Sequence, residues 1–192
     1  MTDEELVAVL ASPLRGRRRP RSLTGYRNWV MFRVLAHTGL RSQELLSLDV
    51  SDVTLSGVNA GRIQVRNGKG GRDRVVGLSA PDLSILRDEY LKEWGISSGP
   101  LFRSLTTGER LAYDSLKKQV RRHALLAGVA PGKNITPHTF RHSYATRLYR
   151  SHKNLVAVSH ALGHSSVRTT QSYVHVDASE VIDQMASIAL PV

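Results

Sequence analysis

The sequence contains no cysteine, and that absence alone excludes several kinds of site. There is no disulfide framework, no thiolate nucleophile and no cysteine-based zinc site. No apolar run approaches the ~20 residues that a membrane-spanning helix needs. The N-terminal residues MTDEELVAVLAS are acidic before they are apolar, which is the wrong charge order for a signal peptide. We therefore predict a cytoplasmic protein that makes no membrane contact.

Acidic residues are few compared with basic ones. The 192 residues include 16 Asp and Glu against 27 Lys and Arg, a net charge of +11. This excess favours a surface that binds a polyanion, above all nucleic acid. A merely soluble basic protein is the alternative. The length suggests one domain, or one domain with an appendage.

The periodicity of apolar residues predicts a mainly helical fold with one small antiparallel β-sheet, of the α+β class. A hairpin with a glycine-rich tip is predicted where Ile63 and Val65 precede Gly-Lys-Gly-Gly and Val75 and Val76 follow it. Gly39 and Gly163 are expected to end the helices before them, and Ser42 to cap the helix after it. The helices are predicted at residues 3–11, 26–37, 43–48, 81–94, 113–127, 137–150, 153–162 and 178–188, with a short one carrying Tyr173.

The stretch TPHTFRHSYAT predicts a helix that presents charge at its start. Thr136 is an N-cap candidate and Pro137 suits the first helical position. At ~100° per residue, His138 and Arg141 project together beside an inward apolar stripe, in the first turn, where an anion is favoured. Ordinary solvated charges are the alternative. A metal site is not predicted, because Thr139 stands where the zinc-protease pattern needs glutamate.

Two further motifs indicate a function only in combination with the others. In TGLRSQEL, Arg41 precedes a predicted helix and Glu44 follows three residues later. They form either a surface ion pair of little energetic value or an arginine oriented by a carboxylate. In NGKGGRDR, Lys69 stands at the predicted hairpin tip, either simply solvated or able to reach outward.

In this order, the four boxes TGLRSQEL, NGKGGRDR, TPHTFRHSYAT and LGHSSVRTTQSYVH resemble the signature boxes of the tyrosine recombinases, the phage-integrase family. The resemblance extends from about residue 3 to about residue 185 and covers that family's catalytic domain. It departs from the family at RSHKNL, where members often have a glycine-containing loop between helices.

The resemblance implies a role for each matching residue. Arg41 and Arg141 would clamp the scissile phosphate, and Glu44 would support Arg41. Lys69 would protonate the leaving 5′-oxygen, and His138 would act as a general base or phosphate donor. The remaining matches are His164 as a phosphate ligand, Tyr173 as the nucleophile and His175 as a supporting residue.

Elementary chemistry demands a set of this kind. A phenol has a pKa near ~10 and is a poor nucleophile at neutral pH unless a base or a cationic pocket helps it ionise. Guanidinium groups match the oxygens of a phosphate better than an ammonium does. The leaving alkoxide needs an acid. Nothing in this chemistry requires a metal or other cofactor. No nucleotide is consumed either, because the phosphotyrosine ester conserves the energy of the broken bond.

The expected function is site-specific DNA recombination by integration, excision or inversion, through a covalent 3′-phosphotyrosine and a Holliday junction. The partner would be double-stranded DNA, with a homotetramer on paired sites and a monomer free in solution as the open alternative. A type IB topoisomerase and a non-catalytic DNA-binding protein on the same fold are the competing functions.

The expected organisation is a single catalytic domain over residues 1–192, without the N-terminal DNA-binding domain that most members of the family have. The tail, residues 177–192, is predicted to pack on a neighbouring protomer or on its own core. Phosphate contacts are predicted for exposed basic residues, although the N-terminal arginines could equally belong to a solvated loop. These residues are Arg15, Arg17, Arg18, Arg19, Arg21, Arg66, Arg72, Arg74, Lys117, Lys118, Arg121 and Arg122.

Overall fold

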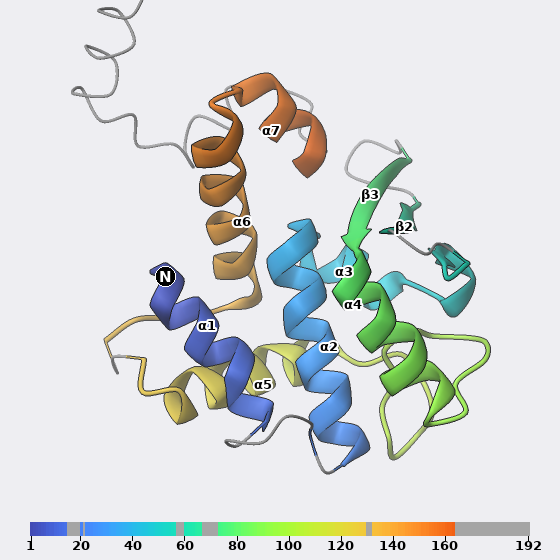
Figure 1. Ribbon diagram of the computed structural model, residues 1–192. Helices are drawn as coiled ribbons and strands as arrows, with labels where there is room; N and C mark the ends of the chain where they lie inside the picture. The colour runs from blue at the N-terminus through green and yellow to red at the C-terminus, as the bar shows by residue number, and fades with distance from the viewer. Residues whose placement is uncertain (15–19, 21, 57–59, 67–72, 130–131, 164–192) are drawn as a thin grey trace, which may run out of the picture.

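The computed structural model describes residues 1–14, 20, 22–56, 60–66, 73–129 and 132–163. Within them the fold is mainly helical with one small antiparallel sheet, as the sequence predicted (Figure 1). The helices are α1 (Asp3–Ala11), α2 (Leu23–Thr38), α3 (Ser42–Ser47), α4 (Ala80–Ser84), η3 (Ile85–Lys92), α5 (Tyr113–Leu126), α6 (Pro137–His152) and α7 (Leu155–Leu162), and the short turns are η1 (Ser12–Leu14) and η2 (Val50–Asp52). The strands are β1 (Val53–Thr54), β2 (Ala60–Val65) and β3 (Arg74–Ser79).

Helix α2 forms the centre of the core. Ser22 caps it by accepting a hydrogen bond from the Gly25 N–H, and Gly39 ends it in the left-handed conformation at φ 63°. Most of its side chains are buried, including Phe32 and Leu35. Burial on nearly all sides is expected for a helix with neighbours all round it. In Figure 1, α2 runs through the middle of the molecule, with α6 beside it and the sheet on the opposite side.

The predicted hairpin is present as the antiparallel pair β2–β3. Ile63 pairs with Val76 and Val65 with Arg74, so the two apolar positions of β2 face the core. Val75 is exposed and Val76 buried, which is the alternation of a strand with one face in the core. The register brings Arg74, the first residue of β3, level with the last residue of β2.

Helices α6 and α7 form a second packing unit against α2. Pro137 stands at the start of α6, and the Thr136 N–H donates to the Thr139 hydroxyl, which satisfies one backbone donor at the helix entrance. Val158 and Leu162 of α7 pack against Ala145 of α6 in a small apolar cluster. In Figure 1, α7 lies across the upper end of α6, so its C-terminal end comes close to α2.

Several helix boundaries and one strand differ from the prediction. Helix α2 begins at Leu23, three residues before its predicted start, with Ser22 as its cap. Helix α3 begins at Ser42 rather than after it, with Arg41 at the N-cap, because the Glu44 carboxylate reaches back to the Arg41 N–H at 2.7 Å. Strand β1 was not predicted, since two residues are too short to show a period. Helix α6 extends to His152, two residues beyond its predicted end, and α7 begins at Leu155 with Asn154 as its cap. Among the described residues, no helix combines the length and hydropathy needed to cross a membrane.

The chain reverses between α6 and α7 at Lys153, in the segment where the sequence departs from the family pattern. Lys153 ends α6 in the left-handed conformation at φ 49°, which L side chains adopt at a cost of about 1–2 kcal/mol. A glycine meets no such cost, but it loses more backbone entropy on folding. We therefore expect Lys153→Gly to stabilise the fold by about 0.5–1 kcal/mol, measured as a rise in the midpoint of thermal unfolding of a few degrees.

Lys153→Ala is the control for this prediction. It keeps the left-handed cost and removes the ammonium that lies 5.8 Å from the centre of the Tyr149 ring. The alanine variant should be no more stable than the parent. A glycine variant less stable than the alanine variant would show that the backbone conformation at Lys153 carries no cost.

Candidate active site

Two arginines from different parts of the chain meet at the C-terminal end of α7. The Arg41 Nη2 lies 3.3 Å from the Gly163 carbonyl oxygen, and the Arg141 Nη2 lies 2.8 Å from the Leu162 carbonyl oxygen. Carbonyls at the end of a helix lack partners within the helix and carry partial negative charge, which favours cations there. These two arginines are therefore held at the point where the chain continues to His164.

Arg141 is anchored from a second side as well. Its Nη1 donates to the Gly39 carbonyl oxygen at 2.7 Å, and the residue is only 1% exposed. Its side chain thus ties the end of α2 and the end of α7 to α6. A guanidinium has five N–H donors, and these contacts engage two of them in a fixed plane.

A buried carboxylate organises the first arginine. Glu44 accepts hydrogen bonds at 2.7 Å from the Arg41 backbone and at 2.8 Å from the Arg41 Nη1. It also accepts one from each terminal nitrogen of Arg74, both at 2.8 Å. Burial alone would raise the pKa of Glu44, but the hydrogen bonds from Arg74 and from the Arg41 backbone lower it to about 2. Glu44 is consequently an anion at neutral pH between two guanidinium groups.

His138 lies in the first turn of α6 and is exposed. Its pKa is lowered from the usual value, first by desolvation and then by the positive charges of Arg141 and Arg41. At neutral pH the imidazole is therefore mainly neutral, and one ring nitrogen can accept a proton or a hydrogen bond. A neutral base beside two guanidinium groups suits a site that binds a phosphate and activates a hydroxyl.

The structure thus brings together four of the predicted site residues: Arg41, Glu44, His138 and Arg141. The other four lie outside the described residues. They are Lys69, His164, Tyr173 and His175. In the sequence, His164 directly follows Gly163, whose carbonyl Arg41 contacts.

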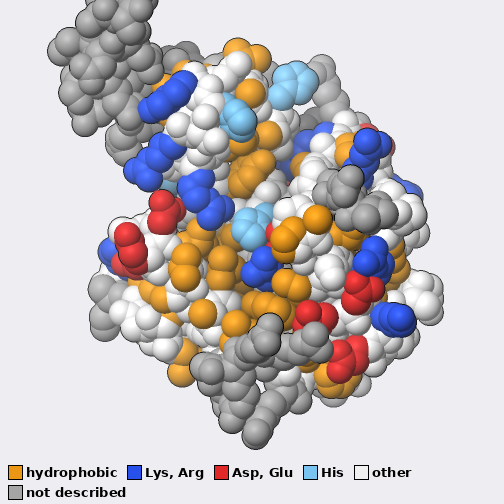
Figure 2. All heavy atoms as spheres, in the orientation of Figure 1, with side chains coloured by type: hydrophobic (Ala, Val, Ile, Leu, Met, Phe, Trp, Pro, Cys, Tyr) orange, Lys and Arg blue, Asp and Glu red, His pale blue; other side chains and the backbone are white. Residues whose placement is uncertain are grey.

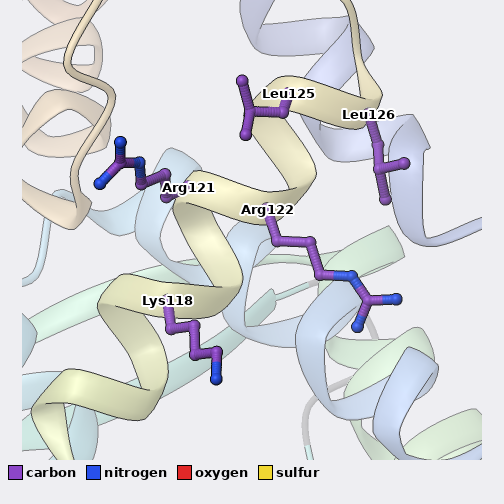
Figure 3. Close-up of a pocket in the computed structure, with 5 residues that line it drawn as sticks. All are labelled: Lys118, Arg121, Arg122, Leu125 and Leu126. Atoms are coloured by element: carbon purple, nitrogen blue, oxygen red, sulfur yellow. The ribbon is translucent and has the colours of Figure 1, made fainter.

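The predicted DNA-contacting residues fall into three groups. Lys117, Lys118, Arg121 and Arg122 are exposed on one face of α5, where Lys118 and the two arginines line a hollow of about 450 Å³ with Leu125 and Leu126. Figure 3 shows Arg121 and Arg122 leaving the helix in opposite directions. Basic side chains that do not belong to this predicted set also gather over α6 in Figure 2. Outside the described residues lie Arg15, Arg17, Arg18, Arg19, Arg21 and Arg72.

The two remaining candidates differ sharply in their surroundings. The Arg66 side chain is 62% exposed and pairs with Asp52 at 2.8 Å. The Arg74 side chain is only 13% exposed, and both terminal nitrogens of its guanidinium bond to Glu44. Arg66 is therefore placed as a surface cation, whereas Arg74 is occupied within the protein.

Sequence reasoning missed the backbone groups that orient the arginines. The acceptors include the carbonyls of Gly39 and Gly163, which were predicted only as helix ends. Both glycines have positive φ, and a Cβ on Gly163 would lie 2.9 Å from the Arg74 Cδ. In the sequence, each of these glycines ends a predicted helix and precedes a predicted site residue, Arg41 or His164, by no more than two positions. That spacing was the available sign that the glycine carbonyls belong to the site. In the part of the chain that the structure describes, no three His, Asp or Glu side chains are grouped as metal ligands.

Comparison with known proteins agrees with this geometry. The sequence pattern of the phage integrase family matches residues 1–180. The tyrosine recombinase XerD of Staphylococcus epidermidis is 35% identical over 188 residues, which cover 93% of this chain and 58% of the relative. The tyrosine recombinase XerD of Chlorobaculum tepidum is also 35% identical, over 184 residues. The chain spans less than two thirds of the length of these relatives.

Solved structures show the same fold. A crystal structure of the XerH site-specific recombinase bound to its difH substrate, before cleavage, matches with a TM-score of 0.79 and 32% identity, over 97% of this chain and 53% of that one. The catalytic domain of bacteriophage HP1 integrase matches with a TM-score of 0.65 over 97% of this chain and 93% of that one; at 21% identity it supports the fold alone. By sequence and by fold, this chain belongs to the phage integrase family, the tyrosine recombinases.

Proposed function

We propose that this chain catalyses site-specific recombination of double-stranded DNA by cleaving and rejoining strands through a 3′-phosphotyrosine. The observation that carries the proposal is the convergence of Arg41, His138 and Arg141 beside the residue that precedes His164. Recombinases of known structure that share this fold include one captured with its DNA substrate before cleavage.

In the proposed reaction, the phenolate oxygen of Tyr173 attacks the scissile phosphorus and the bond from phosphorus to the 5′-oxygen breaks. His138 takes up the phenol proton or donates to a phosphate oxygen, and Lys69 gives a proton to the leaving 5′-oxygen. Arg41 and Arg141 stabilise the charge that gathers on the non-bridging oxygens. Attack by a 5′-hydroxyl on the phosphotyrosine then reverses the steps and rejoins a strand.

This scheme consumes no nucleotide, because the energy of the broken ester remains in the phosphotyrosine. Exchange of strands between two sites needs two pairs of active sites, so we infer a tetramer on paired DNA sites, with residues 177–192 packing on a neighbouring protomer. The exposed basic face of α5 and the exposed Arg66 supply phosphate contacts, whose affinity falls with rising salt. A cytoplasmic location remains a prediction.

Covalent trapping tests the proposal. Incubation with nicked duplexes that carry candidate sites from the neighbouring genome should give a protein–DNA adduct that survives denaturation, and peptide mass mapping should place it on Tyr173. A relaxation assay on supercoiled plasmid separates the two catalytic functions, because a type IB topoisomerase relaxes any plasmid as a monomer. Salt-sensitive DNA binding with no adduct on any site tested would favour the non-catalytic alternative.

A further inference from the structure

Arg74 is the residue whose surroundings differ most from its expected role as a DNA contact. It belongs to β3, yet its guanidinium lies against Glu44, 30 positions earlier, with both terminal nitrogens 2.8 Å from carboxylate oxygens. This paired arrangement of two N–H donors and two oxygens fixes the carboxylate in direction as well as position. The Arg74 side chain is 13% exposed, and that of Glu44 is 8% exposed.

The same carboxylate holds Arg41. One Glu44 oxygen accepts from the Arg41 Nη1 and the other from the Arg41 backbone N–H. Four hydrogen bonds therefore converge on Glu44, two from each arginine. Because Arg41 is bonded to Glu44 at two points, a rotation of the carboxylate moves the Arg41 guanidinium with it.

Arg74 also touches the other end of the site. A Cβ built on Gly163 would lie 2.9 Å from the Arg74 Cδ and 3.0 Å from its Nε, so the arginine packs directly on that glycine. Gly163 in turn supplies the carbonyl that accepts from Arg41. Arg74 thus contacts both the carboxylate and the backbone segment between which Arg41 is held.

We propose that Arg74 is a positioning residue of the active site: it holds Glu44 and Gly163 so that the Arg41 guanidinium is directed at the scissile phosphate. The role rests on the strand-cleavage function proposed above. Arg74 would then act through Arg41 without touching DNA, and the hairpin strand β3 would help to set the geometry of the phosphate site.

The first test compares Arg74→Met with Arg66→Ala, a neighbouring cation of the same hairpin that is exposed. Displacement of a catalytic group by about 1 Å can cost about 100-fold in rate, so we expect cleavage at saturating nicked DNA to slow by about 10–100-fold in Arg74→Met. Its DNA affinity and the slope of log affinity against log salt should not change. In Arg66→Ala, which removes a proposed phosphate contact, the salt slope should instead fall by about one.

The pH profile separates positioning from a purely structural role. The charged groups against Glu44 are Arg41, from the turn before α3, and Arg74, from β3. Loss of Arg74 removes hydrogen bonds that lower the pKa of Glu44 and leaves its burial, so that pKa rises in Arg74→Met. As the pH is lowered, cleavage by the variant should then begin to fall at a higher pH than cleavage by the parent does, because Glu44 gains a proton and releases Arg41.

Two further variants keep the proposal open to refutation if Arg74→Met does not fold. Arg74→Lys keeps the charge without the paired donors, and it should also slow saturated cleavage with an unchanged salt slope. Glu44→Gln combined with Arg74→Met should be no slower than Glu44→Gln alone, because both changes release the same arginine. A parental rate in Arg74→Lys, or a reduced salt slope with a parental rate at saturation, would overturn the proposal. Absence of an adduct in the parent protein would instead refute the proposed function.

Discussion

Phenylalanine in place of Tyr173 should abolish the covalent protein–DNA adduct while DNA affinity stays within about twofold of the parent. The substitution removes only the phenol oxygen, which is the atom that would form the bond to phosphorus. Phosphate contacts from other side chains supply most of the affinity, so binding should persist with the same salt dependence. The measurement is the yield of denaturation-resistant adduct on nicked DNA, together with a binding isotherm for the same variant.

Tyr144→Phe is the matched control. Tyr144 follows Arg141 by three residues on α6, and its ring lies against Gly39, so it is the described tyrosine nearest in sequence to the site arginines. Burial raises its pKa, which disfavours the phenolate that attack requires. Tyr90 is a poorer candidate still, since burial raises its pKa to about 12 and its hydroxyl donates to the Leu101 carbonyl oxygen. An adduct that persisted in Tyr173→Phe but vanished in Tyr144→Phe would reassign the nucleophile.

The helix ends that the sequence predicted best are those with a local signal. Helix α1 runs over residues 3–11 as predicted, with Thr2 as its cap. Helices α2 and α7 end at Gly39 and Gly163 because each glycine adopts a positive φ that closes the last turn. The predicted 81–94 helix is present as α4 followed by η3, a continuous helical stretch whose second part has the wider π form. Nothing in an apolar pattern distinguishes those two forms.

The contacts within the site are of two kinds. The sequence predicted those between residues close in the chain, and it did not predict those between distant residues. The bond between Glu44 and Arg41 was predicted because three residues on a helix start bring the two side chains together. Proximity of His138 to Arg141 followed from helical periodicity. The bonds from Arg141 to Gly39 and from Arg74 to Glu44 join residues 102 and 30 positions apart. They depend on how α2, α6 and the hairpin pack, and no spacing rule encodes that.

Substitution of Arg141 by alanine should damage both folding and catalysis. Two buried carbonyls, of Gly39 and Leu162, would lose their donor, and the space of a fully buried side chain would be left behind. We expect the free energy of unfolding to fall by about 3–5 kcal/mol, which lowers the midpoint of thermal unfolding by about 10 °C. At a temperature where the variant is folded, cleavage at saturating DNA should fall by at least about 100–1000-fold, because a charge-assisted donor to the phosphate is lost.

Arg147→Ala separates these two effects. Arg147 lies on the same helix, is half-buried, and donates through its Nη2 to the Ala36 carbonyl of α2, so it also ties α6 to α2. Its removal should lower the free energy of unfolding by about 1–2 kcal/mol while saturated cleavage stays within about threefold. If Arg141 served only to join helices, its loss would slow cleavage no more than the loss of Arg147 does, once both proteins are folded.

Arg141→Lys completes the argument because it keeps the positive charge. Lysine is a point charge without a planar fork, so it cannot hold two carbonyls in fixed directions and present paired donors to a phosphate from the same plane. We expect this variant to retain DNA affinity and more of the stability than Arg141→Ala, and still to lose about 100-fold in saturated cleavage. Cleavage near the parental rate in Arg141→Lys would mean that charge alone is needed at this position, and that the two carbonyl contacts orient nothing that matters for the reaction.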